Sequence, residues 1–351
     1  MSKSTSRSTS RFSGCVCYNL AHHSEEEHIT RITDPIPAWT GWSRKMITIR
    51  TVSTLPFPRP LSQSEYVQKM AEIQGEAVGT PDMGRKTASF WRMENLSSAF
   101  LKNARPGQSL NDPGMPVPIR PIAHCGMGIA AVELANFDVC RLREIIESFS
   151  NPEYRLFAYE GTGAMLALYE PDLFALMSRM CAALGILPLA RLTPPADPDA
   201  FLRSFEPEIQ RLISHGYGRM LYFKNHTLAS AIRAVSRATY LQPWPCVQGI
   251  AFAYSMVNNS DLGRVFRAGE NLRGHDVGEP FSEGLVYALE FWEWMAPGFL
   301  ERLKVTTDYE NGLKQAARLG VETGRARGPL APFAVERNNV TESRGSQKLN
   351  V

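Results

Sequence analysis

The stretch Ser282-Glu-Gly-Leu-Val-Tyr-Ala-Leu-Glu-Phe-Trp-Glu-Trp-Met295 repeats acidic and aromatic side chains at the spacing of an α-helix. Glu283, Tyr287, Glu290 and Trp294 follow one another at intervals of four, three and four residues. Because an α-helix has about 3.6 residues per turn, these side chains share one face. Most of the remaining side chains are apolar, so the stretch predicts a helix that packs against other helices.

Comparable apolar-faced segments extend, with breaks, from Tyr154 to Gly320. They predict packed helices near residues 154–169, 171–184, 199–239, 245–270, 280–302 and 307–322. Prolines and glycines separate these segments at intervals typical of an antiparallel bundle. The sequence therefore predicts a mainly α protein, an antiparallel helical bundle that encloses an apolar cavity.

Three shorter features precede this region. Residues 62–75 have a helical pattern, whereas residues 106–121 contain five prolines and predict a loop or an arm. Asp138 is a candidate N-cap for a helix that ends near Phe149.

The two ends of the chain lack a sustained apolar period. Residues 1–45 are Ser-rich and then mixed polar, which predicts a flexible or loosely packed N-terminal extension. Residues 323–351 combine glycine, proline and polar side chains, and predict a flexible tail. We therefore expect one helical domain over residues 46–322, with its chemistry in residues 154–322.

The composition excludes several classes of protein. The hydrophobic content of 44% predicts a sizeable core, and a formal net charge of +3 gives no field that would favour nucleic acid. Six cysteines in 351 residues are too few for a disulfide scaffold and fit a reducing compartment. Since the N-terminus lacks an apolar signal core and no apolar run is long enough to span a bilayer, we expect a cytoplasmic protein without membrane insertion.

Glu160 interrupts the apolar run Arg155-Leu-Phe-Ala-Tyr-Glu-Gly-Thr-Gly-Ala-Met-Leu-Ala-Leu168. The two glycines beside it allow close approach of another helix, so the carboxylate is expected to be buried. A buried carboxylate needs a partner, which is either a metal ion or an arginine.

The segment His215-Gly-Tyr-Gly-Arg-Met-Leu-Tyr-Phe-Lys-Asn225 combines two cations, a histidine and three aromatic side chains. Met220 and Lys224 are one helical turn apart, so an apolar group and a charge share a face that suits an amphipathic substrate. The alternative is structural: Lys224 extends its ammonium group to solvent, and Arg219 forms a salt bridge.

The segment from Gln248 to Asp261 is an apolar helix that ends in Asn-Asn-Ser-Asp. Asn258 and Asp261 are three residues apart and offer oxygen ligands of the kind that Mg²⁺ prefers. The alternative is an ordinary helix end at which Asp261 caps the next helix.

The opening stretch supplies further candidates. Glu290 or Glu293 offers a metal ligand, and Phe291, Trp292 and Trp294 offer π faces that stabilise a carbocation. Their structural alternative is that aromatic side chains at helical spacing form the core. Together, the four segments provide the oxygen ligands, cation and apolar cavity that ionisation of a diphosphate requires.

These segments resemble the fungal humulene synthases of tropolone sesquiterpenoid biosynthesis, which lie outside the usual terpene cyclase signatures. The likeness covers about residues 154–320. It rests on Tyr159-Glu-Gly-Thr-Gly-Ala-Met165, Gly216-Tyr-Gly-Arg-Met-Leu-Tyr-Phe-Lys224, Val257-Asn-Asn-Ser-Asp-Leu262 and Glu290-Phe-Trp-Glu-Trp294. The resemblance implies a sesquiterpene cyclase that holds farnesyl diphosphate with two magnesium ions and an essential lysine.

The resemblance also assigns roles to residues. Lys224 corresponds to the diphosphate lysine and Met220 to the residue that influences alkene geometry. We expect the magnesium ligands to be, in declining order, Asn258, Asp261, Glu160 and Glu290. The expected substrate-binding residues are Arg219, Tyr222, Phe252, Met256, Tyr287, Phe291, Trp292 and Trp294.

The expected reaction is magnesium-assisted loss of diphosphate, closure of an 11-membered ring and loss of a proton, which gives humulene. The sequence leaves two alternative functions open. A non-catalytic carrier of an apolar ligand needs the aromatic surface without the metal ligands. A tailoring enzyme that acts on a neutral terpenoid or polyketide leaves Lys224 without an anionic partner.

Overall fold

The computed structural model describes residues 60–168, 193–225 and 227–327 of the chain. All regular secondary structure within these ranges is helical, so the prediction of a mainly α fold is confirmed. The helices are α3 (Gln63–Gly79), α4 (Met83–Lys102), the 3₁₀ helix η1 (Val117–Ile119), α5 (Arg120–Ala135), α6 (Val139–Phe149), α7 (Leu156–Leu168), α9 (Pro198–Arg203), α10 (Pro207–Lys224), α11 (Leu228–Val235), α12 (Pro243–Val257), α13 (Leu262–Asn271), α14 (Gly278–Met295), α15 (Phe299–Arg302) and α16 (Asp308–Arg327).

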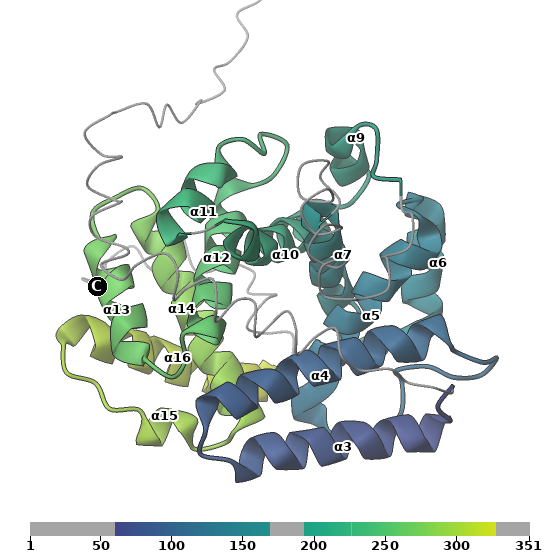
Figure 1. The fold of residues 1–351 in the computed structure, drawn as a ribbon, viewed down its shortest axis with the longest axis horizontal. Helices are drawn as coiled ribbons and strands as arrows, with labels where there is room; N and C mark the ends of the chain where they lie inside the picture. The colour runs from purple at the N-terminus through teal and green to yellow at the C-terminus, as the bar shows by residue number, and fades with distance from the viewer. Residues whose placement is uncertain (1–59, 169–192, 226, 328–351) are drawn as a thin grey trace, which may run out of the picture.

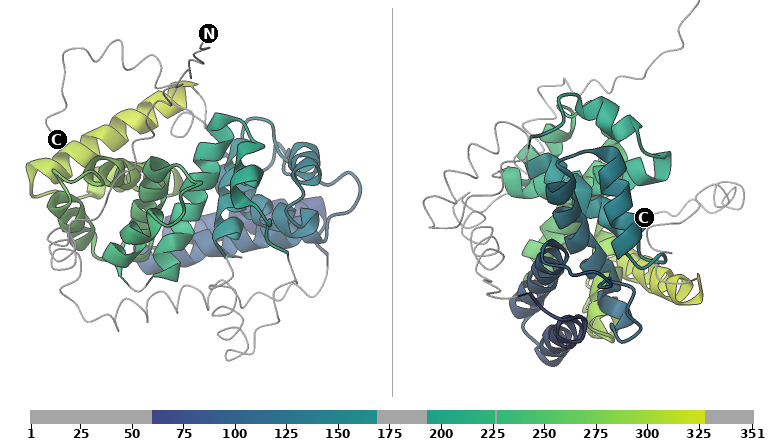
Figure 2. Two further views of the ribbon diagram at one scale, coloured as in Figure 1. Left: turned by 90° about the horizontal axis from the view of Figure 1, so that it is seen from above. Right: turned by 90° about the vertical axis from the view of Figure 1, so that its right-hand side faces the viewer.

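The long helices pack in the order in which they occur in the sequence. Helices α4, α5, α7, α10, α12, α14 and α16 each contact the next in this series. The series curves back on itself, because α4 also contacts α12 through the Thr87 hydroxyl, which donates to the Met256 carbonyl at 3.0 Å. Phe90 of α4 likewise meets Phe291 of α14. Helices α4, α5, α7, α10, α12 and α14 therefore surround a common centre, while α16 lies along the edge of the molecule (Figure 2).

Glycines set the close packing of the central helices. A Cβ atom added to Gly163 of α7 would lie 1.9 Å from the Ile213 carbonyl oxygen of α10, and one added to Gly216 of α10 would lie 1.8 Å from the Glu160 carbonyl oxygen. Residue numbers therefore rise along α7 as they fall along α10, which makes the pair antiparallel. Glycines join α5 to α7 and α10 to α12 in the same reciprocal way.

Local signals explain where several helices begin. The Ser62 hydroxyl accepts from the Glu65 N–H at 3.2 Å and forms a capping box at the start of α3. Asp138 accepts from the Arg141 N–H at 2.8 Å, as predicted for the N-cap of α6. Residues 106–121 are irregular for most of their length, but they contain η1 and the start of α5.

The structure differs from the prediction at several boundaries: the segment predicted at residues 199–239 is divided into α9, α10 and α11, and those at 245–270 and 280–302 each contain two helices. Helix α16 continues to Arg327, so residues 323–327 belong to a helix and not to a flexible tail. The polar Gly-Arg-Ala-Arg run contains no strong stop, and the first proline after it is Pro329, where a helix cannot easily continue. Helix α4, at residues 83–102, was not predicted, because its apolar face is interrupted by serine and glutamate.

Several predictions fall on other parts of the chain. The extension at residues 1–45, the helix at residues 171–184 and the tail beyond residue 327 lie outside the described residues. Within the described ranges, the longest helices are too short or too polar to cross a bilayer. The described cysteines, Cys125, Cys140 and Cys246, are free thiols.

Candidate active site

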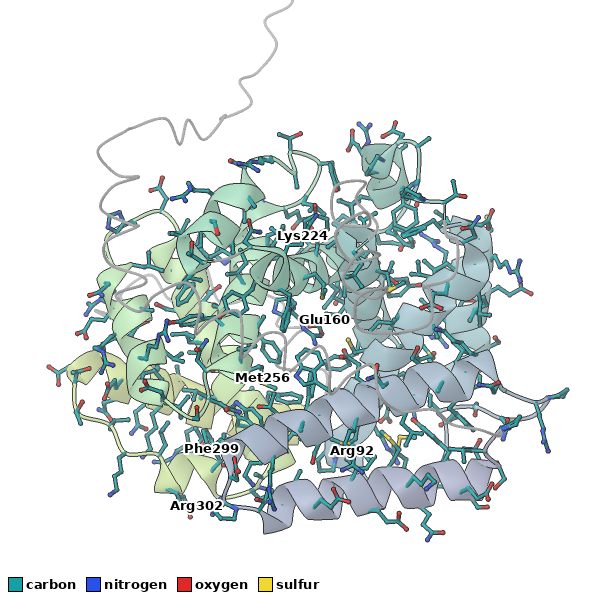
Figure 3. All side chains as sticks on the ribbon, viewed as in Figure 1. Arg92, Glu160, Lys224, Met256, Phe299 and Arg302 are labelled. Atoms are coloured by element: carbon teal, nitrogen blue, oxygen red, sulfur yellow. The ribbon has the colours of Figure 1, made fainter. Side chains whose placement is uncertain are left out.

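A buried ionic cluster occupies the middle of the molecule, where α4, α5, α7 and α10 meet. The Arg219 Nη1 atom donates to Glu160 Oε1 at 2.9 Å, and Nη2 donates to Glu94 Oε1 at 3.3 Å. His215 Nδ1 lies 3.0 Å from the same Glu160 oxygen. We call Glu94, Cys125, Glu160, His215 and Arg219 the Arg219 cluster. Figure 3 shows Glu160 near the middle of the molecule.

The glycines that bring the helices together also assemble this cluster. Gly216 follows His215 directly, Gly161 follows Glu160, and the glycine at position 126 follows Cys125. Each glycine lets a neighbouring backbone approach so closely that a Cβ atom there would lie about 2 Å from a carbonyl oxygen of that backbone. The polar side chain next to each glycine is thereby carried into the crossing of two helices.

The pKa values of the two carboxyl groups in the cluster are shifted in opposite directions. Although burial would raise the pKa of Glu160, the Arg219 guanidinium and His215 lower it to about 2. Burial raises the pKa of Glu94 in spite of Arg219. Glu160 is therefore the carboxylate that balances the arginine charge. The same carboxylate raises the pKa of Arg219 despite its burial.

Cys125 links the second carboxyl to the arginine. Its thiol donates to Glu94 Oε1 at 3.0 Å, and its sulfur accepts from Arg219 Nη1 at 3.2 Å. Burial raises the pKa of Cys125 well above its ordinary value, with the charge of Glu94 adding to the effect. The thiol form is thus favoured, and Cys125 takes part in the cluster as both hydrogen-bond donor and acceptor.

Aromatic rings surround the guanidinium group. Its central carbon lies 5.4 Å from the ring centre of Phe252, 5.6 Å from that of Phe90 and 5.8 Å from that of Trp91. Phe291 meets Phe90 edge to face at 5.2 Å and Phe252 at 5.6 Å. Since these rings present π faces to a cation in a dry environment, the centre of the molecule already stabilises one positive charge in this way.

A set of half-buried apolar side chains continues from these rings. We call Met220, Phe223, Tyr287, Phe291 and Trp294 the aromatic face. It touches the buried residues at several points: Phe223 meets Trp91 at 5.6 Å, and Tyr287 meets His215 at 6.4 Å. These partly exposed apolar side chains are the candidates for contact with an apolar ligand near the cluster.

Met220 and Lys224 lie one turn apart on α10, as the sequence predicted. Both side chains are half-buried, and Lys224 is the last residue of the helix. Figure 3 places Lys224 close to α10 and above Glu160. The structure thus puts the predicted diphosphate lysine at the end of the helix that also carries Arg219.

The α12–α13 turn holds two of the four predicted magnesium ligands. The Asn258 amide Nδ2 donates to the Tyr222 hydroxyl at 3.2 Å and to the Tyr254 carbonyl at 2.9 Å. Asp261 is exposed and accepts from the Arg264 N–H at 3.1 Å as the N-cap of α13. Helix capping, the structural alternative for Asp261, is therefore present.

The two glutamates among the predicted ligands lie elsewhere. Glu160 is paired with Arg219, which was the alternative to metal binding, and Glu290 lies against Gly320 of α16. Within the described ranges, no group of three or more His, Cys, Asp or Glu side chains has the arrangement of a metal site. The magnesium role of these residues stays a prediction.

Glu290 has an unusual environment. Its side chain is 95% buried, and its Oε2 atom has no hydrogen-bond partner among the described residues. Burial raises the pKa of Glu290 to about 8. A Cβ atom at Gly320 would lie 1.7 Å from Oε1, so the carboxyl group fills the space that this glycine leaves.

The remaining predicted binding residues divide between the core and the aromatic face. Tyr222, Met256 and Trp292 are buried, and Trp292 packs against Phe299 at 6.4 Å. Glu293, the other candidate ligand on α14, accepts from the backbone N–H groups of residues 298 and 300 and so caps α15. For these residues the structure shows core packing and capping.

Sequence reasoning missed the contribution of α4. Glu94, Phe90 and Trp91 all come from that helix, and Cys125 from α5 was also overlooked. One signal was available: Gly126-x-Gly128, Gly161-x-Gly163 and Gly216-x-Gly218 repeat the same spacing in three helices, each next to a polar residue of the cluster.

Comparison with protein-family models, with curated proteins and with solved structures finds no match.

Proposed function

We propose that this chain is a magnesium-dependent sesquiterpene cyclase that converts farnesyl diphosphate to humulene. One observation carries the proposal: half-buried aromatic side chains of α10 and α14 contact the rings that surround Arg219, and the half-buried Lys224 ends α10 directly after one of them, Phe223. An apolar surface with π faces suits a farnesyl chain that becomes a carbocation. A lysine at its edge suits the diphosphate group.

The diphosphate end of the reaction depends on positive charge. Lys224 offsets the charge that develops on diphosphate as the primary C–O bond breaks and diphosphate leaves with the electron pair. Asn258 and Asp261 share the α12–α13 turn and would supply oxygen ligands to a magnesium ion there, whereas Glu160 is paired with Arg219 and Glu290 lies against Gly320. Magnesium bound at that turn would neutralise further diphosphate charge.

The aromatic face acts on the hydrocarbon end. Phe291 and its neighbours hold the farnesyl chain folded and exclude water, so that the distal alkene attacks the allyl cation and closes the 11-membered ring. Loss of a proton from the carbon beside the new cation returns its C–H electrons to an alkene. The departing diphosphate accepts this proton, so the products are humulene and singly protonated diphosphate, and atoms and charges balance.

A carrier of an apolar ligand is the second candidate. Arg219 is already balanced by Glu160, so the aromatic face requires no anionic group on its ligand. A tailoring enzyme for a neutral terpenoid or polyketide would use the same surface. Both candidates predict that Lys224 is dispensable.

The test is incubation of the purified protein with farnesyl diphosphate and Mg²⁺, followed by analysis of hydrocarbons and released diphosphate. Lys224→Ala is expected to reduce turnover about a thousandfold, because it removes several kcal/mol of charge stabilisation in a dry site. Lys69→Ala, on the exposed face of α3, is the matched control and should leave turnover unchanged. Binding of farnesol without any diphosphate release would instead favour the carrier.

Met220→Leu sharpens this test. The change nearly conserves volume, so the fold should persist. It reshapes the surface one turn from Lys224 and is expected to change the E/Z ratio of the product. An unchanged ratio together with full activity of Lys224→Ala would exclude this part of α10 from the active site.

A further inference from the structure

Trp91 of α4 has a buried polar group that the proposed reaction has not yet used. Its side chain is about 92% buried, and its indole Nε1 atom has no hydrogen-bond partner among the described residues. Leaving such a donor unpaired costs about 1–3 kcal/mol. Buried N–H groups are almost always paired. Trp292 and Trp294 also have unpaired buried indole N–H groups, but the Trp91 ring is the one of the three that lies over the Arg219 guanidinium among the described contacts.

The surroundings of Trp91 indicate an acceptor for its N–H. Its ring lies 5.8 Å from the Arg219 guanidinium carbon and meets the Phe223 ring edge to face at 5.6 Å. Arg219 and Phe223 are one turn apart on α10, and Phe223 directly precedes Lys224. The indole therefore contacts both Arg219 and the residue that precedes Lys224, so an anionic oxygen held by Lys224 would be an acceptor for its N–H.

We propose that the Trp91 indole N–H donates a hydrogen bond to a diphosphate oxygen of the bound substrate. This inference rests on the proposed function and adds a second, uncharged contact to the one that Lys224 makes. Because Nε1 is buried, the oxygen reaches it only when a neighbouring side chain moves, and we expect the half-buried Phe223, whose ring meets the indole, to be that side chain. Binding of the diphosphate is thus coupled to movement of Phe223.

The first test measures binding to the full-length protein in the presence of Mg²⁺. The probes are farnesyl thiodiphosphate, which ionises slowly, inorganic diphosphate and farnesol, each titrated calorimetrically. Trp91→Phe removes the N–H and is expected to weaken binding of both diphosphate probes about tenfold, because a hydrogen bond to a charged group is lost. Farnesol binding should stay unchanged.

Trp244→Phe is the matched control. Trp244 lies on α12, is partly exposed and donates its N–H to Glu283 at 2.7 Å. The same chemical change there should alter none of the three affinities. Equal binding of the diphosphate probes by wild type and Trp91→Phe would overturn the proposal, and so would a parallel loss of farnesol binding, since that would assign Trp91 to packing.

The second test observes the N–H directly. The chain has six tryptophans, and in ¹⁵N-tryptophan-labelled protein the Trp91 indole resonance is the one missing from Trp91→Phe, or from Trp91→Tyr if the first variant does not fold. Inorganic diphosphate should shift this resonance downfield. A resonance that stays in place while the protein binds the probe overturns the inference alone. Failure of wild type to bind any diphosphate probe overturns the proposed function.

Discussion

Two buried glutamates, Glu160 on α7 and Glu290 on α14, show how differently one residue type can be accommodated. Both are about 95% buried. Glu160 accepts from Arg219 and has a pKa lowered to about 2, whereas Glu290 faces Gly320 and has a pKa raised to about 8. At neutral pH the first is charged and the second is mostly protonated.

The difference teaches that burial alone does not decide the charge of a carboxyl group. Desolvation raises the pKa of both groups, and only a cation at hydrogen-bond distance reverses its effect. The α7–α10 crossing supplies that cation, while α16 presents a glycine. We therefore expect the region around Glu160 to be sensitive to loss of its cation, and the region around Glu290 to be sensitive to pH.

The largest expected effect is at the paired glutamate. Arg219→Met should lower the free energy of unfolding by about 3–5 kcal/mol, because it leaves Glu160 buried without its cation. Chemical denaturation measures this loss. Arg203→Met, which breaks an exposed pair with Asp199, is the control and should change stability by less than about 1 kcal/mol. Equal effects of the two substitutions would refute the assignment of Arg219 as a buried partner.

The next effect is on the crossing that holds the cluster. Gly216→Ala places a methyl group 1.8 Å from the Glu160 carbonyl oxygen, so α7 and α10 must separate. We expect a loss of about 1–3 kcal/mol, as for an overpacked core, measured by thermal unfolding. Gly75→Ala is the control, since nothing lies within 4 Å of its added methyl, and it should not destabilise the protein. Normal stability of Gly216→Ala would mean that the crossing is looser than described.

The unpaired glutamate predicts a dependence on pH. The pKa of Glu290 is raised from its usual value of 4.5 to about 8, so this group stabilises the fold fully below pH 4.5. Its contribution falls by up to about 1.4 kcal/mol per pH unit between pH 4.5 and 8, because the unfolded chain releases the proton first.

Glu290→Gln removes that ionisation. The stability of the variant relative to wild type should therefore rise with pH and level off above pH 8, as followed by urea unfolding from pH 5 to 9. A constant difference between the two proteins would show that Glu290 has an ordinary pKa.

The smallest effect concerns Asp261, the N-cap of α13. Asp261→Ala should lower stability by about 1 kcal/mol, whereas Asp261→Asn should preserve it, since asparagine caps equally well. A magnesium titration of activity then separates the two roles. If Asp261→Asn retains both stability and magnesium affinity, Asp261 caps the helix without binding the metal.

The local part of this structure could be predicted from the sequence. The apolar period predicted helices at α7, α10, α12, α14 and α16, a helical pattern was predicted where α3 lies, and the N-cap Asp138 was found from residue type and position. These features depend on side chains that lie within a turn or two of each other along the chain. The need of Glu160 for a partner was equally predictable, because it interrupts an apolar run beside two glycines.

The choice of partners depended on the tertiary structure. Arg219 and Cys125 reach the central cluster from α10 and α5, and Glu94 reaches it from α4, a helix whose broken apolar pattern hid it. Glu290 repeats the acidic and aromatic spacing of its helix, yet it meets a glycine, and its Oε2 atom has no partner among the described residues. Sequence spacing fixes the face of a helix on which a side chain lies, whereas the crossing of distant helices decides what that face meets.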